Sequence, residues 1–431
     1  MREGAPRCPR RSYYRSDLLQ GASRTATALV QVPTGAITAI RFENRTKLSD
    51  QVLLDRMKSR PGQPLDTEQL DRDMAGIYGL GLFETVSYRI EAEDGGNVVV
   101  VSPKLHPSGK DYLRFGAKLT NDFNGGSTYD LSVSYTKTAL NSLNGEWQTQ
   151  AIFGQTLALY TELYQPLEAK GRFYVKPSVY VGERQVNLFQ DDKKIAEARL
   201  GELRGELLGG FNVSDDLLVF TAFTGGVGYV REKTGTGTIP KDNFTTARLS
   251  VGFGYDTFDN LNFPRHGVLA VGRYNWSDHA IGADHDFQSS QLSVNGAMSW
   301  GRNTIVVGAL VNLTWNGTPG PEDLYNLGGP LRLSGLPAHD LTGGQALLGR
   351  VVYYREISGF GPSFLHIPLY AGFSVEYGNV FNRVGDIDLG DMRVGGSVFL
   401  GADTFIGPIM LGFGLTQGGE EAVYLAVGSL F

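Results

Sequence analysis

Two short segments carry the side chains best placed to do chemistry. The first, residues 325–344, is rich in glycine, and its candidate site residues are Gly328, Gly329, Arg332, Leu333, Ser334, Gly335 and Leu336. The second holds Glu376 and Gly378 on one face of an alternating stretch. A carboxylate removed from water needs a cation or hydrogen bonds. We therefore expect Glu376 to pair with an arginine. The candidates are Arg332 as first choice, Arg350 or Arg393 as fallback, and Arg248.

Two interpretations of this charged set stay open. The carboxylate and the arginines could form a network that only braces the interior, or the glycine-rich segment could be a latch that controls access to it. Covalent catalysis is not expected, because a lipase-type nucleophile needs a Gly-x-Ser-x-Gly elbow, which neither Ser23 nor Ser334 has. The histidines lack metal-ligand spacing. We predict no enzyme activity for this chain, no metal and no cofactor.

The elements around these residues follow a period of two. In Thr246–Asp256 the odd positions are apolar and the even positions are polar or small, and the stretches 304–313 and 369–378 repeat this pattern. A period of two indicates β-strand. Strands of about 9–12 residues with aromatic ends are typical of membrane barrels, whereas the strands of a soluble all-β sandwich, the alternative, usually run about 5–6 residues.

The alternation predicts sixteen strands from Tyr112 onward, an even number as single-chain bacterial barrels require. Their centres lie near residues 115, 133, 149, 162, 178, 204, 222, 251, 271, 294, 308, 351, 373, 396, 411 and 427. The predicted fold is mostly β, with a sixteen-stranded transmembrane antiparallel barrel over residues 110–431 in the bacterial outer membrane. Phe258–Gly267 is then a periplasmic turn, and Gly317–Gln345 is the sixth extracellular loop, which we expect to fold inward.

Composition limits the other classes of protein. No run of eighteen apolar residues exists, which excludes a helical membrane span. Glycine makes up 57 of 431 residues, above the usual share of about 7%, and barrel strands tolerate it. The net charge of −6 gives no reason to expect nucleic acid as a partner. The single cysteine, Cys8, excludes an internal disulfide.

The N-terminal residues 1–35 predict an irregular basic linker. Six arginines against Glu3 and Asp17 leave a charge of +4, and the segment lacks the apolar stretch of a signal peptide. An outer-membrane barrel must first cross the inner membrane. We therefore expect the chain to be the C-terminal part of a longer protein or to start from an internal codon; an unusual export route is the alternative.

Residues 36–105 predict a small unit of order β-α-α-β-β. A strand at Ile37–Phe42 precedes a helix from about Ser49 to Lys58. A second helix starts at Asp66 with a capping-box-like sequence, and Leu70, Met74, Ile77 and Tyr78 form its apolar face. Strands over residues 86–90 and 98–101 follow.

This unit resembles a polypeptide-transport-associated (POTRA) domain, the periplasmic module of the bacterial surface-antigen superfamily of outer-membrane assembly and secretion barrels. The resemblance rests on the element order, on Pro61-Gly62 and on the segment Tyr78–Val86, which is similar to the pattern Y-x-x-G-x-F-x-x-V. One copy is present, whereas insertases of the superfamily typically carry several.

The glycine-rich loop resembles the superfamily loop that folds back into the lumen. The usual motif there is hydrophobic-Arg-Gly-aromatic, and Leu333-Ser334-Gly335-Leu336 lacks both the arginine and the aromatic residue. Whether Arg332 substitutes for the arginine stays open. Glu376 and Gly378 match the acidic partner motif, and the terminal Phe431 resembles the C-terminal assembly signal of outer-membrane proteins.

Together these features look most like the C-terminal part of patatin-type outer-membrane phospholipases. This resemblance implies a barrel that anchors, translocates or presents a passenger, most plausibly a lipase domain absent from this chain. Its implied partners are outer-membrane lipid, the barrel assembly machinery during insertion and that passenger; a homodimer is left open. The alternatives are an insertase, which predicts a weak seam between the first and last strands, and a two-partner secretion transporter, whose usual plug helix is not visible. A passive porin is disfavoured.

Overall fold

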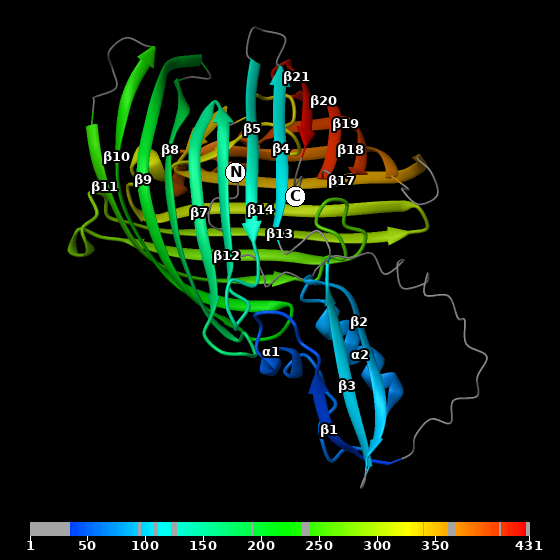
Figure 1. Cartoon of the computed structure of the whole chain (residues 1–431). Helices are drawn as coiled ribbons and strands as arrows, with labels where there is room; N and C mark the ends of the chain where they lie inside the picture. Colours follow the sequence, from blue (N-terminus) through cyan, green and yellow to red (C-terminus); the bar gives the residue numbers. More distant parts are fainter. Residues whose placement is uncertain are drawn as a thin grey trace.

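The computed structural model of the chain describes residues 35–93, 96–106, 111–121, 127–190, 193–234, 242–338, 340–360, 367–404 and 407–427. The predictions for the basic linker up to residue 34 and for Phe431 lie outside these residues. The described part consists of a small α/β unit (residues 37–105) and a closed barrel (Figure 1).

The α/β unit has the predicted element order. It contains β1 (Ile37–Phe42), α1 (Asp50–Leu54), α2 (Thr67–Tyr78), β2 (Phe83–Glu93) and β3 (Gly96–Leu105). Strand β3 lies between β1, to which it is parallel, and β2, to which it is antiparallel. Leu70, Met74 and Ile77 of α2 are buried in the core of this unit, as their spacing predicts.

The ends of the two helices depend on two aspartates. Asp66 caps α2, since its side chain accepts a hydrogen bond from the backbone N–H of Gln69. Helix α1 is shorter than predicted because the chain leaves the helical path before Lys58. There the carboxylate of the buried Asp73 accepts hydrogen bonds from the backbone N–H groups of Lys58 at 2.7 Å and Ser59 at 2.9 Å. In a longer helix, these N–H groups would donate to backbone carbonyls instead.

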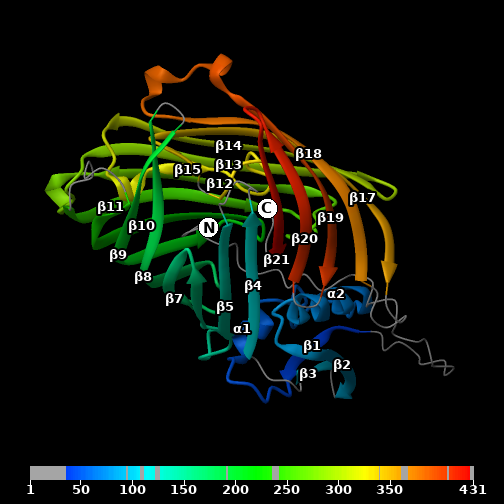
Figure 2. The ribbon, with the colours of Figure 1, turned by 90° about the horizontal axis from the view of Figure 1, so that it is seen from above.

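The α/β unit is packed against the barrel. Ala139, in the connection between two barrel strands, is 3% exposed and belongs to the same apolar cluster as the core of the unit. The backbone N–H of Ser49 donates to the carbonyl of Ser142 in that connection at 2.9 Å. Figure 2 places the unit at one end of the barrel, opposite the connection between β18 and β19.

Sixteen antiparallel strands close the barrel in the described part of the chain, as predicted, and all sixteen expected centres fall within them. They are β4 (Asp111–Asn121), β5 (Ser127–Lys137), β6 (Glu146–Gly154), β7 (Thr156–Pro166), β8 (Phe173–Gln190), β9 (Lys193–Asn212), β10 (Leu217–Thr234), β11 (Asp242–Asp256), β12 (Gly267–Ser277), β13 (Phe287–Trp300), β14 (Asn303–Gly317), β17 (Gln345–Phe360), β18 (Ile367–Phe381), β19 (Arg393–Thr404), β20 (Gly407–Thr416) and β21 (Glu420–Val427). Strand β21 pairs with β4 to complete the ring.

The side chains alternate between the two faces of the wall as the sequence predicts. Val307 and Val375 point outward and are more than half exposed, whereas their neighbours Val306 and Ser374 are buried inside. This arrangement places a polar and partly filled lumen inside an apolar outer surface. Within the described residues, none of the helices has the length and apolar character needed to cross a membrane.

Asp73 should stabilise the α/β unit in a pH-dependent way. Burial raises the pKa of its carboxyl, but the hydrogen bonds it accepts lower this pKa more, and the net shift is downward. The stabilisation is therefore present above the unfolded pKa of about 3.9 and is lost as pH falls through the lower folded pKa. Asp73→Asn should lower the free energy of unfolding of the unit by about 2 kcal/mol at pH 7.

Trypsin cleavage of the unit in the intact, detergent-solubilised chain measures this effect. Cleavage of the Asp73→Asn variant should be faster than that of wild type at neutral pH. The exposed Glu68→Gln variant, in the same helix, is the control. Equal cleavage of both variants at pH 7 would contradict the role given to Asp73.

Candidate functional site in the barrel lumen

The loop between β14 and β17, here called L6 (residues 318–344), enters the lumen. It begins with a 3-10 turn, η3 (Pro321–Asp323), and continues into a short hairpin of β15 (Tyr325–Leu327) and β16 (Leu341–Gly343). Between these strands lies a compact tip, residues 328–336. The tip is held by its own backbone hydrogen bonds, from Gly328 N–H to the Arg332 carbonyl and from Gly329 N–H to the Leu336 carbonyl, both at 2.9 Å.

Several residues of the tip adopt left-handed backbone angles. Gly328 and Gly329 have φ values of 121° and 88°, which glycine adopts without strain. Leu331 and Leu333 have φ values of 59° and 71°, an uncommon conformation for leucine, and both side chains are buried. Strained backbone persists only where the surroundings fix it, so the contacts around the tip must hold it in place.

The principal contact of the tip is between Ser334 and Glu376 of β18. The Glu376 carboxylate accepts the Ser334 backbone N–H at 2.7 Å and the Ser334 hydroxyl at 2.6 Å. The Ser374 hydroxyl donates a third bond to it at 2.6 Å. Both Ser334 and Glu376 are 0% exposed. Hydrogen bonds to a carboxylate are stronger than bonds between neutral groups, so this contact attaches the tip firmly to the wall.

Two glycines, Gly335 in the tip and Gly414 in the wall, allow the backbones of tip and wall to touch. A Cβ on Gly335 would lie 2.3 Å from the backbone nitrogen of Thr416 and 2.4 Å from the carbonyl oxygen of Glu420. On the wall side, a Cβ on Gly414 would lie 2.2 Å from the carbonyl oxygen of Ser334. The Gly335 N–H also donates to the Thr416 hydroxyl at 3.0 Å. The inward fold of the loop was predicted, and the structure confirms it.

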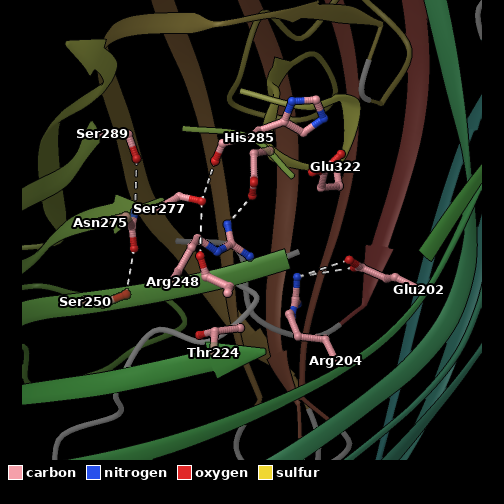
Figure 3. Close-up of polar contacts among 12 residues, drawn as sticks. Glu202, Arg204, Thr224, Arg248, Ser250, Asn275, Ser277, His285, Ser289 and Glu322 are labelled. Atoms are coloured by element: carbon pink, nitrogen blue, oxygen red, sulfur yellow. Dashed lines mark hydrogen bonds and ion pairs between the residues drawn. The ribbon is translucent and has the colours of Figure 1, made fainter. Parts of the chain in front are cut away.

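The base of L6 is attached to the opposite side of the barrel. Arg248 of β11 forms an ion pair with Asp323, and Arg184 of β8 donates to the Glu322 carbonyl at 3.1 Å. Figure 3 shows Arg248 beside the segment that carries Glu322. L6 therefore spans the lumen from β8 and β11 to β18 and β20.

A second segment enters the lumen from the other end. This turn, here called T4 (residues 257–266), joins β11 and β12. Phe263 of T4 is 2% exposed and stacks on Tyr370 of β18, with 4.4 Å between ring centroids. Asn260 and Asn262 donate to Asp403 at the end of β19, at 3.0 and 3.2 Å.

L6 and T4 share one apolar cluster inside the barrel. Leu331 from the L6 tip and Phe263 from T4 both belong to it, and Tyr354, Tyr370 and other lumen residues of β14–β21 complete it. The lumen along this half of the wall is therefore filled from both ends.

The other half of the lumen wall, along β7–β12, carries ion pairs beside smaller apolar clusters, such as that of Leu208, Leu218 and Phe220. Arg273 and Glu206 form an ion pair at 2.6 Å, and Lys176 lies 3.2 Å from Glu162. Figure 3 shows further polar contacts in this region, including Arg204 with Glu202. Among the described residues, no group of His, Cys, Asp and Glu could hold a metal ion.

The barrel sequence matches a known family over most of its length. A model of the Omp85 superfamily domain covers residues 111–415, which is more than half of the chain. The chain belongs to the Omp85 superfamily. A second model, of the POTRA domain described as a surface antigen variable number repeat, matches residues 36–103. The chain is thus an outer-membrane barrel with one POTRA domain. In the antiparallel barrel, L6 lies at the end opposite the POTRA domain and T4 lies at the nearer end (Figure 2).

Solved structures share this architecture. BamA from Haemophilus ducreyi lacking POTRA domains 1–3 is similar with a TM-score of 0.65 and 15% identity, covering 92% of this chain and 84% of that chain. CdiB from Acinetobacter baumannii is similar with a TM-score of 0.63 and 10% identity, covering 91% of this chain and 74% of that chain. CdiB from Escherichia coli is similar with a TM-score of 0.62 and 12% identity, covering 91% of this chain and 76% of that chain. These identities show the fold alone. None of the curated proteins compared with the chain matches it.

The prediction that an arginine pairs with Glu376 is wrong. In this Omp85 barrel the carboxylate is satisfied by Ser334 and Ser374. Ser334 occupies the position of the usual arginine, and its hydroxyl can reach Glu376 because Gly335 and Gly414 let the backbones touch.

The four candidate arginines have other surroundings. Arg332 donates to the Asn326 carbonyl at 2.8 Å. Arg350 donates to the Leu331 carbonyl at 3.1 Å and to Asn295 at 2.7 Å, so it supports the tip without contacting Glu376. Arg393 pairs with Gly378 in the β18–β19 register, and Arg248 holds the base of L6.

The remaining candidates support the tip by packing. Leu333 and Leu336 are buried in one cluster with Leu348 of β17. Gly378 lies opposite Leu348 in the β17–β18 register. A Cβ on Gly378 would lie 2.9 Å from the side chain of Leu348, so only glycine leaves room for this leucine. Sequence reasoning missed Phe263 and Asp323. The signal for Phe263 was an apolar residue within an otherwise polar turn.

Gly335→Ala should displace the L6 tip, because the added methyl group overlaps the backbone of β20 and cannot be accommodated by a side-chain movement. We expect higher ion conductance in planar bilayers. We also expect the fast-migrating band of the folded barrel on a detergent gel to disappear after heating to a lower temperature than for wild type. Gly385→Ala, at a glycine with nothing within 4 Å of the added atom, is the control. Wild-type conductance for Gly335→Ala would exclude close docking of the tip.

Phe263→Ala should detach T4 from the lumen. Removing a buried phenylalanine costs about 3–5 kcal/mol, and here the loss falls on the contact between T4 and Tyr370. The expected result is rapid protease cleavage within T4 and increased conductance, measured in liposomes and planar bilayers. Phe253→Ala, on the lipid-facing side of β11, controls for loss of an aromatic ring. T4 cleavage at the wild-type rate would refute the insertion of this turn.

Proposed function

We propose that this Omp85 barrel inserts other outer-membrane polypeptides into the bilayer at the junction between its first and last strands, β4 and β21. The partner is an unfolded outer-membrane polypeptide, whose β-strand can pair with an exposed strand edge. The proposal needs no covalent chemistry, in keeping with the absence of a lipase elbow from the sequence. For this function we propose a chain organised as a basic linker (1–35), a POTRA domain (36–105) and a barrel (110–431).

The observation that carries the proposal is the short pairing at this junction. In the described residues, β4 and β21 pair at five positions, from Val423 with Asn121 to Val427 with Ala117. On its other side β4 pairs with β5 at eleven positions, and β21 pairs with β20 at eight. Within the described residues, which reach Val427, this junction has the fewest paired positions in the wall, and we take it as the place where the strands separate most easily.

The filling of the lumen supports a route through the wall over a route through the centre. L6 and T4 meet on the cluster that contains Leu331 and Phe263. A polypeptide that crosses the lumen along β14–β21 must first remove both segments. This argument favours the insertase over the two-partner secretion transporter. The comparisons do not support the patatin-type branch, and the passenger lipase stays a prediction.

A disulfide across the junction tests the proposal. Leu119 and Leu425 are opposite each other in the β4–β21 register. With Cys8→Ser as background, Leu119→Cys combined with Leu425→Cys should, when oxidised, stop folding of an unfolded porin into proteoliposomes. Reduction should restore it. The matched control combines Leu119→Cys with Tyr129→Cys, which links β4 to its other neighbour, β5.

The readout is the heat-resistant, protease-protected porin formed per hour. Loss of insertion in the junction variant alone supports the proposal. Undiminished insertion by the oxidised junction variant would overturn it. Polypeptide release into the liposome interior that increases with Phe263→Ala would instead indicate transport through the lumen.

A further inference from the structure

A groove of about 910 Å³ lies in the barrel wall across β6–β11. Its apolar lining includes Leu157, Leu159, Val181, Leu203 and Val227, all of which are 46–60% exposed. These residues have the outward parity of their strands, so the groove opens on the lipid side of the barrel.

Two glycines lie on the outward face of β9 at or beside this groove. Gly201 and Gly205 alternate with Leu203 on the outward face, and a Cβ on Gly205 would meet only two backbone oxygens near 4 Å. At Gly201 the space that a side chain would fill is taken by the ring of Tyr229, 2.4 Å from the Cβ position. Gly201 therefore lets the Tyr229 ring lie against the backbone of β9, where it forms part of the groove lining.

A charged rim borders this groove at Tyr229. Arg199 of β9 forms an ion pair with Glu183 of β8 at 2.9 Å, and the Tyr229 hydroxyl donates to the same carboxylate at 2.7 Å. The Arg231 guanidinium lies over the Tyr229 ring, 4.4 Å from its centroid. A ring contact of this kind uses none of the hydrogen-bond donors of arginine. Among the side chains that the structure describes here, two guanidinium groups and one carboxylate thus surround Tyr229.

The rim lies at the level of the outer headgroups. Strand β10 starts at the periplasmic end, and its outward residues are Leu217 through Val227 before Tyr229 and Arg231. The step from Leu217 to Tyr229 rises roughly 28 Å, at about 3.4 Å per residue and a tilt near 45°. The apolar band of such barrels is about 25 Å tall. Tyr229 therefore lies at the outer interface, with Arg199 and Arg231 just beyond it.

We propose that this groove binds a phosphate-bearing lipid of the outer leaflet, with an acyl chain along Leu203 and Val227 and the phosphate at Arg199 and Arg231. Arginine is suited to phosphate because its donors match the phosphate oxygens in pairs. Glu183 positions Arg199 and also limits the net positive charge of the rim. This lipid site is independent of the proposed insertase function.

The test uses the full chain in nanodiscs of phosphatidylcholine with an increasing fraction of lipid A as the probe. Lipid that stays bound after transfer to detergent is measured by mass spectrometry. Wild type should retain lipid A in preference to phosphatidylcholine. Arg199→Gln and Arg231→Gln should each weaken retention roughly fivefold, as expected for about 1 kcal/mol per basic residue at a lipid surface. Arg355→Gln, on an exposed arginine of β17, should not.

Two further variants separate lipid binding from stability. Glu183→Gln removes the carboxylate and should raise lipid A retention, whereas a purely structural role of the rim predicts a decrease. Val227→Trp should fill the groove and lower retention, while Val179→Trp, on the same face outside the groove, should not. Equal retention of lipid A and phosphatidylcholine by wild type, or unchanged retention in the Arg199→Gln, Arg231→Gln double variant, would overturn the proposal.

Discussion

The interior of this barrel depends on one buried carboxylate. Glu376 is removed from water within the wall, and its charge is stabilised by hydroxyl and backbone donors from Ser334 and Ser374. Without such donors a buried carboxylate is strongly destabilising. This contact attaches the L6 tip, with its left-handed leucines, to β18, while the same tip packs against β20. A neutral serine can serve because an ionised acceptor makes even a short hydroxyl bond strong.

Much of the fold could be predicted because its signals are local. Alternation along each strand revealed all sixteen strands and the outward position of residues such as Val307. The apolar spacing in α2 revealed its buried face. The partner of Glu376 could not be predicted in this way. Arginine was the reasonable expectation from charge, but the outcome depends on how closely two backbones approach, which Gly335 and Gly414 decide in three dimensions.

The two halves of the lumen differ in chemistry. Along β14–β21, aromatic rings and two inserted segments form a dry cluster that contains Phe263 and Leu331. Along β7–β12, ion pairs such as Arg273 with Glu206 line the wall. Apolar packing fixes side chains in place, whereas charged groups keep an affinity for water. L6 crosses between these two regions, with its base at Arg248 and its tip in the apolar cluster.

The position of the L6 tip also sets an order of events during synthesis. The tip is contacted by Glu376, Thr416 and Glu420, all of which follow it in the chain. These contacts of the tip with β18, β20 and β21 therefore form only after the last hairpins have formed, whereas the base of L6 contacts the earlier strands β8 and β11. Contacts of such large sequence separation form slowly, so the tip is expected to dock late in the folding of the barrel. Pairing of β21 with β4 and docking of the L6 tip in the lumen are therefore coupled late events in this topology.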